Sequence, residues 1–293
     1  MLKKESILAK LFLAPALFLI AAVALYPILN VIYLSLHRKL LIFDIHRFIG
    51  LENYAYLLQD ARFWRSLGNT FYFVLLSTGL EMLLGLITAL VMHQPRPGKT
   101  FLRAAILVPW AIPTVVSARM WEWIFNPDFG VLNFLLHKIG LLGSSQNWLG
   151  DPGLALHAVI FADVWKTTPF VALLLFAGLQ VLPADIYEAA RIDGANAWQR
   201  FRRVTLPLLM PVFLTTLLFR TLDAFRIFDS VYVLTGGGPA NTSETLSIYA
   251  YKLLFQTLQF GAGSAVAVLT FGCVMIVSLF YIKLLTRGSG KME

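Results

Sequence analysis

The chain has 293 residues, of which 58% are hydrophobic and 14% are charged, whereas soluble domains carry about 25% charged residues. This composition excludes an ordinary cytosolic enzyme. The net charge of +8 fits a membrane protein with basic cytoplasmic loops better than a nucleic-acid-binding protein.

Six apolar segments are long enough to cross a bilayer as helices, which takes about 20 residues. They are roughly 11–36, 69–92, 101–125, 155–181, 207–234 and 262–285. These segments predict an all-α membrane protein in which residues 1–293 form a single transmembrane domain. The first segment contains Ala22-Val23-Ala24, which is similar to a signal-peptidase site, but the apolar run continues to Leu36 and indicates an uncleaved signal-anchor.

The basic residues indicate the orientation of the spans. With six spans, both termini share one side with the loop before the third span and the loop before the fifth. That side collects many lysines and arginines, including Lys10, Lys99, Arg103, Arg200, Arg202 and Arg203. Because positive charge accumulates in cytoplasmic loops, we expect both termini and these loops in the cytoplasm.

The long loop after the first span contains GLENYAYLLQDARFWRSLGNTFYF, in which Tyr54, Leu57, Leu58, Phe63 and Trp64 alternate with polar residues. One interpretation is an amphipathic helix in the outer membrane interface, with its aromatic rings at the level of the lipid headgroups. The other is a loop packed on the outer mouth of the protein.

The segment HQPRPGKT after the second span is similar to a nucleotide-binding P-loop, but it has His93 where the first glycine is required. A membrane span precedes it, whereas a P-loop follows a strand. The chain also lacks the GxSxG and HExxH motifs, and its five histidines are dispersed. We therefore expect no catalytic residue, no metal site and no cofactor in this chain.

Ionisable residues are expensive inside a membrane and usually face a partner or a pathway. The fourth span carries Asp163, Thr167 and Phe170 on one helical face. The fifth span carries charges that alternate in sign every three residues, namely Arg220, Asp223, Arg226 and Asp229.

The charges of the fifth span have two interpretations. They either form ion pairs within and between helices, or they form a polar wall along a translocation path, where hydroxyl groups of a polar solute bind the charged groups and Phe170 stacks on the solute. We favour the path, with Asp163, Thr167, Phe170, Arg220, Asp223 and Arg226 as its residues. Glu81 in the second span has no partner that the sequence identifies.

Between the fourth and fifth spans lies the polar stretch EAARIDGANAWQRFRRVTLPLLMP, residues 188–211. Helix-forming residues precede Gly194, which allows the positive φ that ends a helix, and a second helix precedes Pro207. Small residues at Ala189, Ala190 and Ala195 would let another protein approach the backbone. The simpler alternative is a cytoplasmic connection with arginines that only set the topology.

The pattern EAA, three residues, glycine, nine residues, Val204, Thr205 and Leu206-Pro207 resembles the EAA loop of ABC importer permeases, with valine in place of the usual isoleucine. The segments GLENYAYLL, FWRSLGNTF and VLTGGGPANTSETLSIYAYKLLF also look like segments of the carbohydrate-type permeases, the maltose, trehalose and glycerol-phosphate importer family. The resemblance implies a type I ABC importer permease of the MetI-like fold.

The resemblance also implies a mechanism and partners. In that family the EAA loop docks on a cytoplasmic ATPase, which assigns coupling to Glu188, Ala189, Asp193, Gly194, Ala195 and Pro207. We expect a second homologous permease, two ATP-binding cassette subunits that bind ATP and Mg²⁺, and an extracytoplasmic solute-binding protein. The complex would lie in a bacterial or archaeal inner membrane and import a sugar by ATP-driven alternating access.

Alternatives stay open both for the substrate and for the class of protein. An α-linked disaccharide such as trehalose or maltose fits the resemblance best, and another oligosaccharide or a glycerol-phosphate compound is the alternative. An anionic substrate would require Arg220 or Arg226 to be unpaired. A stand-alone secondary transporter would predict an inverted repeat or broken helices around an ion site and would leave the EAA loop unexplained. A membrane-embedded enzyme is disfavoured because the sequence shows no catalytic constellation.

Overall fold

The computed structural model describes the backbone of residues 2–94 and 97–289, and the side chains of residues 11–94 and 97–284. Among the residues that the structure describes, five helices are long and apolar enough to cross a membrane. A pair of shorter helices, bent by 90°, raises the number of candidate spans to six, which is the number predicted. The chain forms two compact units, Met1–Phe63 with Tyr249–Gly272, and Trp64–Ile248 with Cys273–Glu293.

The first unit begins with a long apolar helix and continues into a small hairpin. Its elements are α1 (Leu2–Ile20), a π-helical turn (Ala21–Leu25), α2 (Tyr26–Ser35), β1 (His37–Leu40), a 3-10 turn (Leu41–Phe43), β2 (Ile45–Phe48), α3 (Glu52–Gln59) and a second π-helical turn (Lys252–Gln256). Apart from Ser35, no described residue of the span Leu11–Ser35 is buried within the chain. This span therefore leaves most of its apolar surface for contact with lipid or with another subunit.

The antiparallel hairpin β1–β2 was not predicted from the sequence. Its strands have four residues each, too few for an alternating pattern to stand out, and Asp44 takes a positive φ of 49° in the turn. The side-chain amide of Asn53 donates to the carbonyls of Ser35 (2.7 Å) and His37 (3.0 Å). These bonds tie the hairpin to α3 and to the end of α2.

Helix α3 lies within the loop for which the sequence left two interpretations. It is a helix, as the first interpretation expects, but Leu57 is fully buried and Phe63 after it nearly so. Leu58 and Trp64 are exposed. One face of the segment is therefore packed against the protein, as the second interpretation expects.

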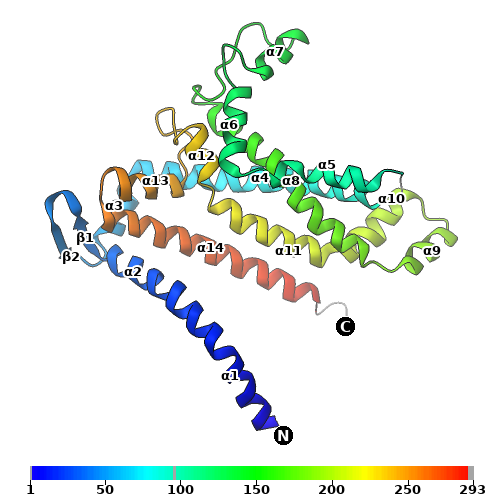
Figure 1. Ribbon diagram of the computed structural model, residues 1–293, viewed down its shortest axis with the longest axis horizontal. Coiled ribbons are helices and arrows are strands. Elements are labelled where there is room, and N and C mark those ends of the chain that lie inside the picture. The colour runs from blue at the N-terminus through cyan, green and yellow to red at the C-terminus, as the bar shows by residue number, and fades with distance from the viewer. Residues whose placement is uncertain (1, 95–96, 290–293) are drawn as a thin grey trace. The chain divides into compact units, whose positions relative to one another are not determined.

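The second unit contains most of the remaining helices. They are α5 (Lys99–Ala111), α6 (Thr114–Ile124), α7 (Val131–Lys138), α8 (Ala155–Gln180), α9 (Ala184–Ile192), α10 (Ala197–Arg200), α11 (Leu206–Phe225) and α12 (Asp229–Leu234), with parts of α4 (Ala61–His93), α13 (Leu246–Tyr251) and α14 (Phe260–Ser289). Helix α8 packs against both α5 and α11, and α12 packs against α6 (Figure 1). Helix α8 is therefore central to this unit.

Two of the predicted spans differ in form from long straight helices. The third breaks between α5 and α6, where Ile112 is extended (φ −73°, ψ 131°) because it precedes Pro113. The fifth, predicted over 207–234, ends at Phe225, and α12 begins separately at Asp229. The break follows Asp223 and Arg226, whose charged side chains are exposed at this helix end.

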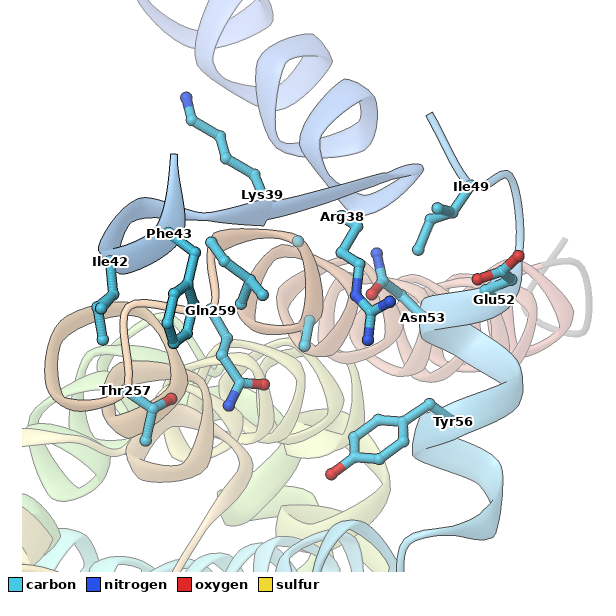
Figure 2. Close-up of a pocket in the computed structure, with 13 residues that line it drawn as sticks. Arg38, Lys39, Ile42, Phe43, Ile49, Glu52, Asn53, Tyr56, Thr257 and Gln259 are labelled. Atoms are coloured by element: carbon cyan, nitrogen blue, oxygen red, sulfur yellow. The ribbon is translucent and has the colours of Figure 1, made fainter. Parts of the chain in front are cut away.

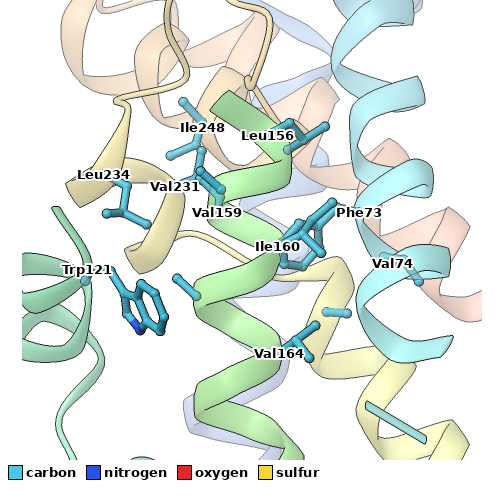
Figure 3. Packing of buried hydrophobic residues seen from close by; sticks show 14 of the residues in the cluster. Phe73, Val74, Trp121, Leu156, Val159, Ile160, Val164, Val231, Leu234 and Ile248 are labelled. Atoms are coloured by element: carbon cyan, nitrogen blue, oxygen red, sulfur yellow. The ribbon is translucent and has the colours of Figure 1, made fainter. Parts of the chain in front are cut away.

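Apolar side chains from α4, α6, α8, α12 and α13 form one core of the second unit (Figure 3). Trp121 of α6 lies across from Val159 and Ile160 of α8 and Val231 of α12 in this cluster. A second cluster joins α4, α8 and α11 around Leu175. Together the two clusters fix the rotation of α8, which decides which of its polar side chains face α4 and α11.

Close helix contact in the second cluster depends on a glycine. A Cβ atom at Gly178 of α8 would lie 2.8 Å from Cγ1 of Val212 and 2.9 Å from Cδ1 of Leu209 on α11. The missing side chain thus lets the backbones approach, as small residues do at helix contacts in membranes.

Candidate functional site

The loop between α8 and α11 folds as helix, turn and helix, as its sequence predicts. Helix α9 ends in a Schellman motif, in which the Gly194 amide donates to the Arg191 carbonyl (3.0 Å) and the Ala195 amide to the Ala190 carbonyl (2.9 Å). Gly194 has φ 76°, which favours glycine because a Cβ atom would be strained there. The EAA residues are thereby held on a helix that stops at a defined point.

Helix α10 restarts the chain with a capping box. The Asn196 side chain accepts from the Gln199 amide (2.9 Å), and the Gln199 side chain accepts from the Asn196 amide (2.8 Å). Arg200 donates to the carbonyl of Ala195 at 2.7 Å. The turn between α9 and α10 is therefore held by hydrogen bonds on both sides of Gly194.

The predicted coupling residues lie on the surface of this loop. Glu188, Ala189, Asp193 and Gly194 are exposed and Ala195 is half-buried. Pro207 is exposed in the first turn of α11, where proline is favoured because it needs no amide partner.

The loop also exposes two large apolar side chains that the sequence analysis did not select. Ile192 is 87% exposed and Trp198 is 66% exposed. Their sequence signal was present, since both are large apolar residues in an otherwise polar connection. Such residues gathered on one loop are typical of a protein-binding surface.

A cavity of about 1070 Å³ lies between this loop and the neighbouring ends of α4 and α8. The loop contributes Glu188, Arg191 and Trp198 to its walls, while α4 contributes mainly leucines. The Tyr187 hydroxyl donates to Thr205 Oγ1 at 3.0 Å and joins the two ends of the loop. The loop therefore borders an open space beside the spans, and its two ends are joined to each other.

The charges within the spans converge on Arg220, which is 1% exposed. Its guanidinium donates to Glu81 of α4 through Nε and Nη2, to Asp163 of α8, and to Asp223 of its own helix at 3.1 Å. Three spans are thus joined by one buried arginine and two buried carboxylates. Glu81, whose partner could not be identified from the sequence, is part of this cluster.

Thr167 completes the cluster, because its hydroxyl hydrogen-bonds to Glu81 Oε1 at 2.6 Å. Asp163 and Thr167 therefore share a face, as predicted, and this face is directed to α4 and α11. Buried charges in a membrane protein require partners of opposite charge and saturated hydrogen bonds, and this arrangement supplies both. Of the two interpretations of the charges in the fifth span, ion pairing between helices is the one that applies to Arg220 in this structure.

Of the other predicted path residues, Asp223 bonds both the buried Arg220 and the exposed Arg226, whereas Arg226 and Phe170 lie outside the buried cluster. Asp223 and Arg226 pair at 3.3 Å with largely exposed side chains. Phe170 stacks on Trp110 of α5, with ring centroids 5.8 Å apart and an angle of 20° between the rings. The structure thus separates the six residues into a buried group, an exposed ion pair and an aromatic pair that includes Trp110, which the sequence analysis did not name.

Among the residues that the structure describes, no group of three or more histidine, cysteine, aspartate or glutamate side chains could hold a metal ion. The charged groups around Arg220 are instead engaged with one another, whereas the hydroxyls of Ser66, Ser77 and Thr78 are buried without a hydrogen-bond partner in the described part of the chain. Such groups can bind a polar solute and transmit movement between helices.

Comparison with known proteins identifies similar chains. Residues 81–290 match the family described as binding-protein-dependent transport system inner membrane component. The chain is 43% identical over 280 residues to the trehalose/maltose transport system permease protein MalF of Thermococcus litoralis, with 96% of this chain and 94% of the relative covered. It is 44% identical over 281 residues to the trehalose transport system permease protein SugA of Mycobacterium tuberculosis, with coverage of 96% and 89%.

The fold also matches a solved structure. A chain of a bacterial ABC transporter involved in the import of the acidic polysaccharide alginate superposes with a TM-score of 0.83, covering 97% of this chain and 96% of the other. Sequence identity is 22%, so this likeness concerns the fold.

Proposed function

Because this chain belongs to the family of inner membrane components of binding-protein-dependent transport systems, we propose that it is one permease half of an ABC importer for an α-linked disaccharide such as trehalose or maltose. The two similar permeases named for trehalose and maltose support this substrate class. A second homologous permease, two ATPase subunits that bind ATP and Mg²⁺, and an extracytoplasmic solute-binding protein complete the proposed complex. In this proposal the ATPase subunits hydrolyse the ATP, and this chain does not.

The observation that carries the proposal is the geometry of the loop over residues 184–205. It presents a rigid pair of helices with Ile192 and Trp198 exposed, joined directly to α8 and α11. These two helices also hold Asp163 and Arg220. A force on the loop therefore acts on the spans that carry the charged residues.

Pairing of both arginines favours a neutral substrate. Arg220 is surrounded by carboxylates and Arg226 is paired with Asp223, so neither guanidinium is free for a phosphate or carboxylate of the substrate. The exposed Asp223–Arg226 pair offers acceptors and donors for sugar hydroxyls, and the Trp110–Phe170 pair offers an aromatic face. A glycerol-phosphate compound, the alternative substrate, would have to displace an existing ion pair at a cost in affinity.

In the proposed cycle, ATP-driven closure of the two ATPase subunits draws the loop of this chain towards the loop of the partner permease. The movement rotates α8 and α11 and opens the path to the solute-binding protein, and ATP hydrolysis reverses it. The termini and the coupling loop lie on the cytoplasmic side, in keeping with the basic residues of the loops.

The test is affinity purification of the chain in mild detergent from its native host, with partners identified by mass spectrometry. Wild-type protein should retain an ATPase and a second permease, and G194W should lose the ATPase. The matched control is G140W, because Gly140 has nearly the same φ (74°) and equally open surroundings but lies after α7. Equal loss of the ATPase from both variants would contradict the assignment of the loop.

Transport in reconstituted vesicles separates the importer from its rivals. The complex should take up radiolabelled trehalose or maltose only with internal ATP and the solute-binding protein. ATP-independent uptake by the purified chain alone would identify a secondary transporter instead.

A further inference from the structure

The hairpin β1–β2 brings basic residues together in an unusual way. In its register Arg38 lies opposite Arg47, and Lys39 lies opposite His46. Like charges directly opposite each other destabilise an antiparallel pair. Within the part of the chain that the structure describes, neither Arg38 nor Arg47 forms an ion pair. An anion bound at this pair of arginines would therefore stabilise the hairpin.

A cavity of about 490 Å³ lies beside the hairpin and contains the Arg38 side chain (Figure 2). Its guanidinium lies between the side chains of Asn53 and Tyr56. Asn53 already donates to two backbone carbonyls. The other polar residues that line the cavity are Arg38, Lys39, Glu52, Tyr56, Thr257 and Gln259, in a volume typical of pockets for small molecules. Among them Arg38, Tyr56 and Gln259 carry donors that a ligand can use.

The opposite wall of this cavity is apolar. Ile42 and Phe43 at the tip of the hairpin line it and remain 63% and 70% exposed. Leu41 beside them is also exposed. Three consecutive exposed apolar residues are unfavourable in water but suit the hydrocarbon boundary of a membrane.

The position of Arg38 in the sequence agrees with a location at the membrane boundary. Helix α2 ends at Ser35, the last residue of the first candidate span, and Arg38 follows three residues later. A guanidinium at this depth lies at the level of lipid phosphates, while a neighbouring Phe43 reaches the acyl chains.

We propose that this cavity binds the phosphodiester headgroup of an anionic phospholipid, with Arg38 and Tyr56 donating to the phosphate oxygens and Ile42 and Phe43 contacting the acyl chains. Arginine suits this role because its planar guanidinium can bind two phosphate oxygens at once. The bound phosphate would also relieve the repulsion between Arg38 and Arg47. The proposal goes beyond the transport function and rests on the membrane placement of the first span.

The test is native mass spectrometry of the complex purified with its partners, titrated with dioleoyl phosphatidylglycerol, dioleoyl phosphatidylcholine or soluble glycerol 3-phosphate. We expect phosphatidylglycerol to bind most tightly, and R38Q to weaken its binding about fivefold to tenfold. The control is R65Q, which removes another exposed positive charge, from the beginning of α4 and outside the cavity. It should change the affinity less than about twofold.

A second variant keeps the test decisive if R38Q folds poorly. Y56F removes one donor from an exposed side chain without a change in charge, and should weaken phosphatidylglycerol binding about threefold. Three results would overturn the proposal. The first is that R38Q and R65Q weaken phosphatidylglycerol binding equally. The second is that glycerol 3-phosphate half-saturates the complex at the same concentration as the lipid. The third is that R38Q weakens docking of the solute-binding protein but leaves lipid binding unchanged.

Discussion

Replacement of Arg220 by glutamine tests whether the buried ion cluster is structural. The change leaves Glu81 and Asp163 facing each other, 0% and 3% exposed, without the cation that joins them. Removal of one partner from a buried ion pair costs about 3–5 kcal/mol of folding free energy, because the remaining charge keeps its desolvation penalty. We expect R220Q to lose stability in this range.

The loss can be measured as the free energy of unfolding of the purified complex in detergent, by titration with sodium dodecyl sulfate. The matched control is R119Q, because Arg119 also forms an ion pair, with Glu122 at 2.6 Å, but its side chain is 62% exposed. An exposed pair contributes under about 1 kcal/mol, so R119Q should unfold almost as the wild type does.

A double variant, E81Q with R220Q, should recover part of the loss because only one charge then remains buried without its partner. The reasoning fails if R220Q and R119Q differ by less than about 1 kcal/mol, or if the double variant is no more stable than R220Q. Unchanged stability with abolished sugar uptake in R220Q would instead favour the interpretation of Arg220 as a direct substrate ligand.

Three further predictions concern local contacts. G178V should lower the free energy of unfolding by about 1–3 kcal/mol because its side chain would overlap Val212, and a similar loss in G79V, where space is open, would contradict this. N196A removes the cap of α10, worth about 1 kcal/mol, and should raise amide exchange in α10 but not in α9. Burial and a hydrogen bond to a carboxylate raise the pKa of Tyr249. The stabilisation that its protonated hydroxyl contributes to the free energy of unfolding should therefore be complete below a pH of about 10, the pKa of an unfolded tyrosine, and should decrease as the pH rises further. Y249F should accordingly be less stable than wild type by about 1.5–3 kcal/mol at pH 8, with the difference narrowing at higher pH; an equal difference at every pH would contradict the shifted pKa.

Much of this protein follows from local sequence. The length of the apolar segments determines the number of spans, because every backbone amide in a bilayer must be bonded within its own helix. The EAA stretch predicts helix, turn and helix because Gly194 allows a conformation that other residues resist. The family, the membrane permease role and the fold class were all predicted and are confirmed by relatives that match nearly the whole chain.

The pairing of side chains depended on tertiary structure. Glu81 binds Arg220, 139 residues away, and the two meet only because α4 and α11 pack with particular rotations around α8. A stripe of charges on one helix shows its own periodicity but carries no information about the face that a neighbouring helix presents. The hairpin β1–β2 and the Trp110–Phe170 pair escaped prediction for the same reason, since short-range patterns specify helices, whereas the contacts between elements are set by how the whole chain packs.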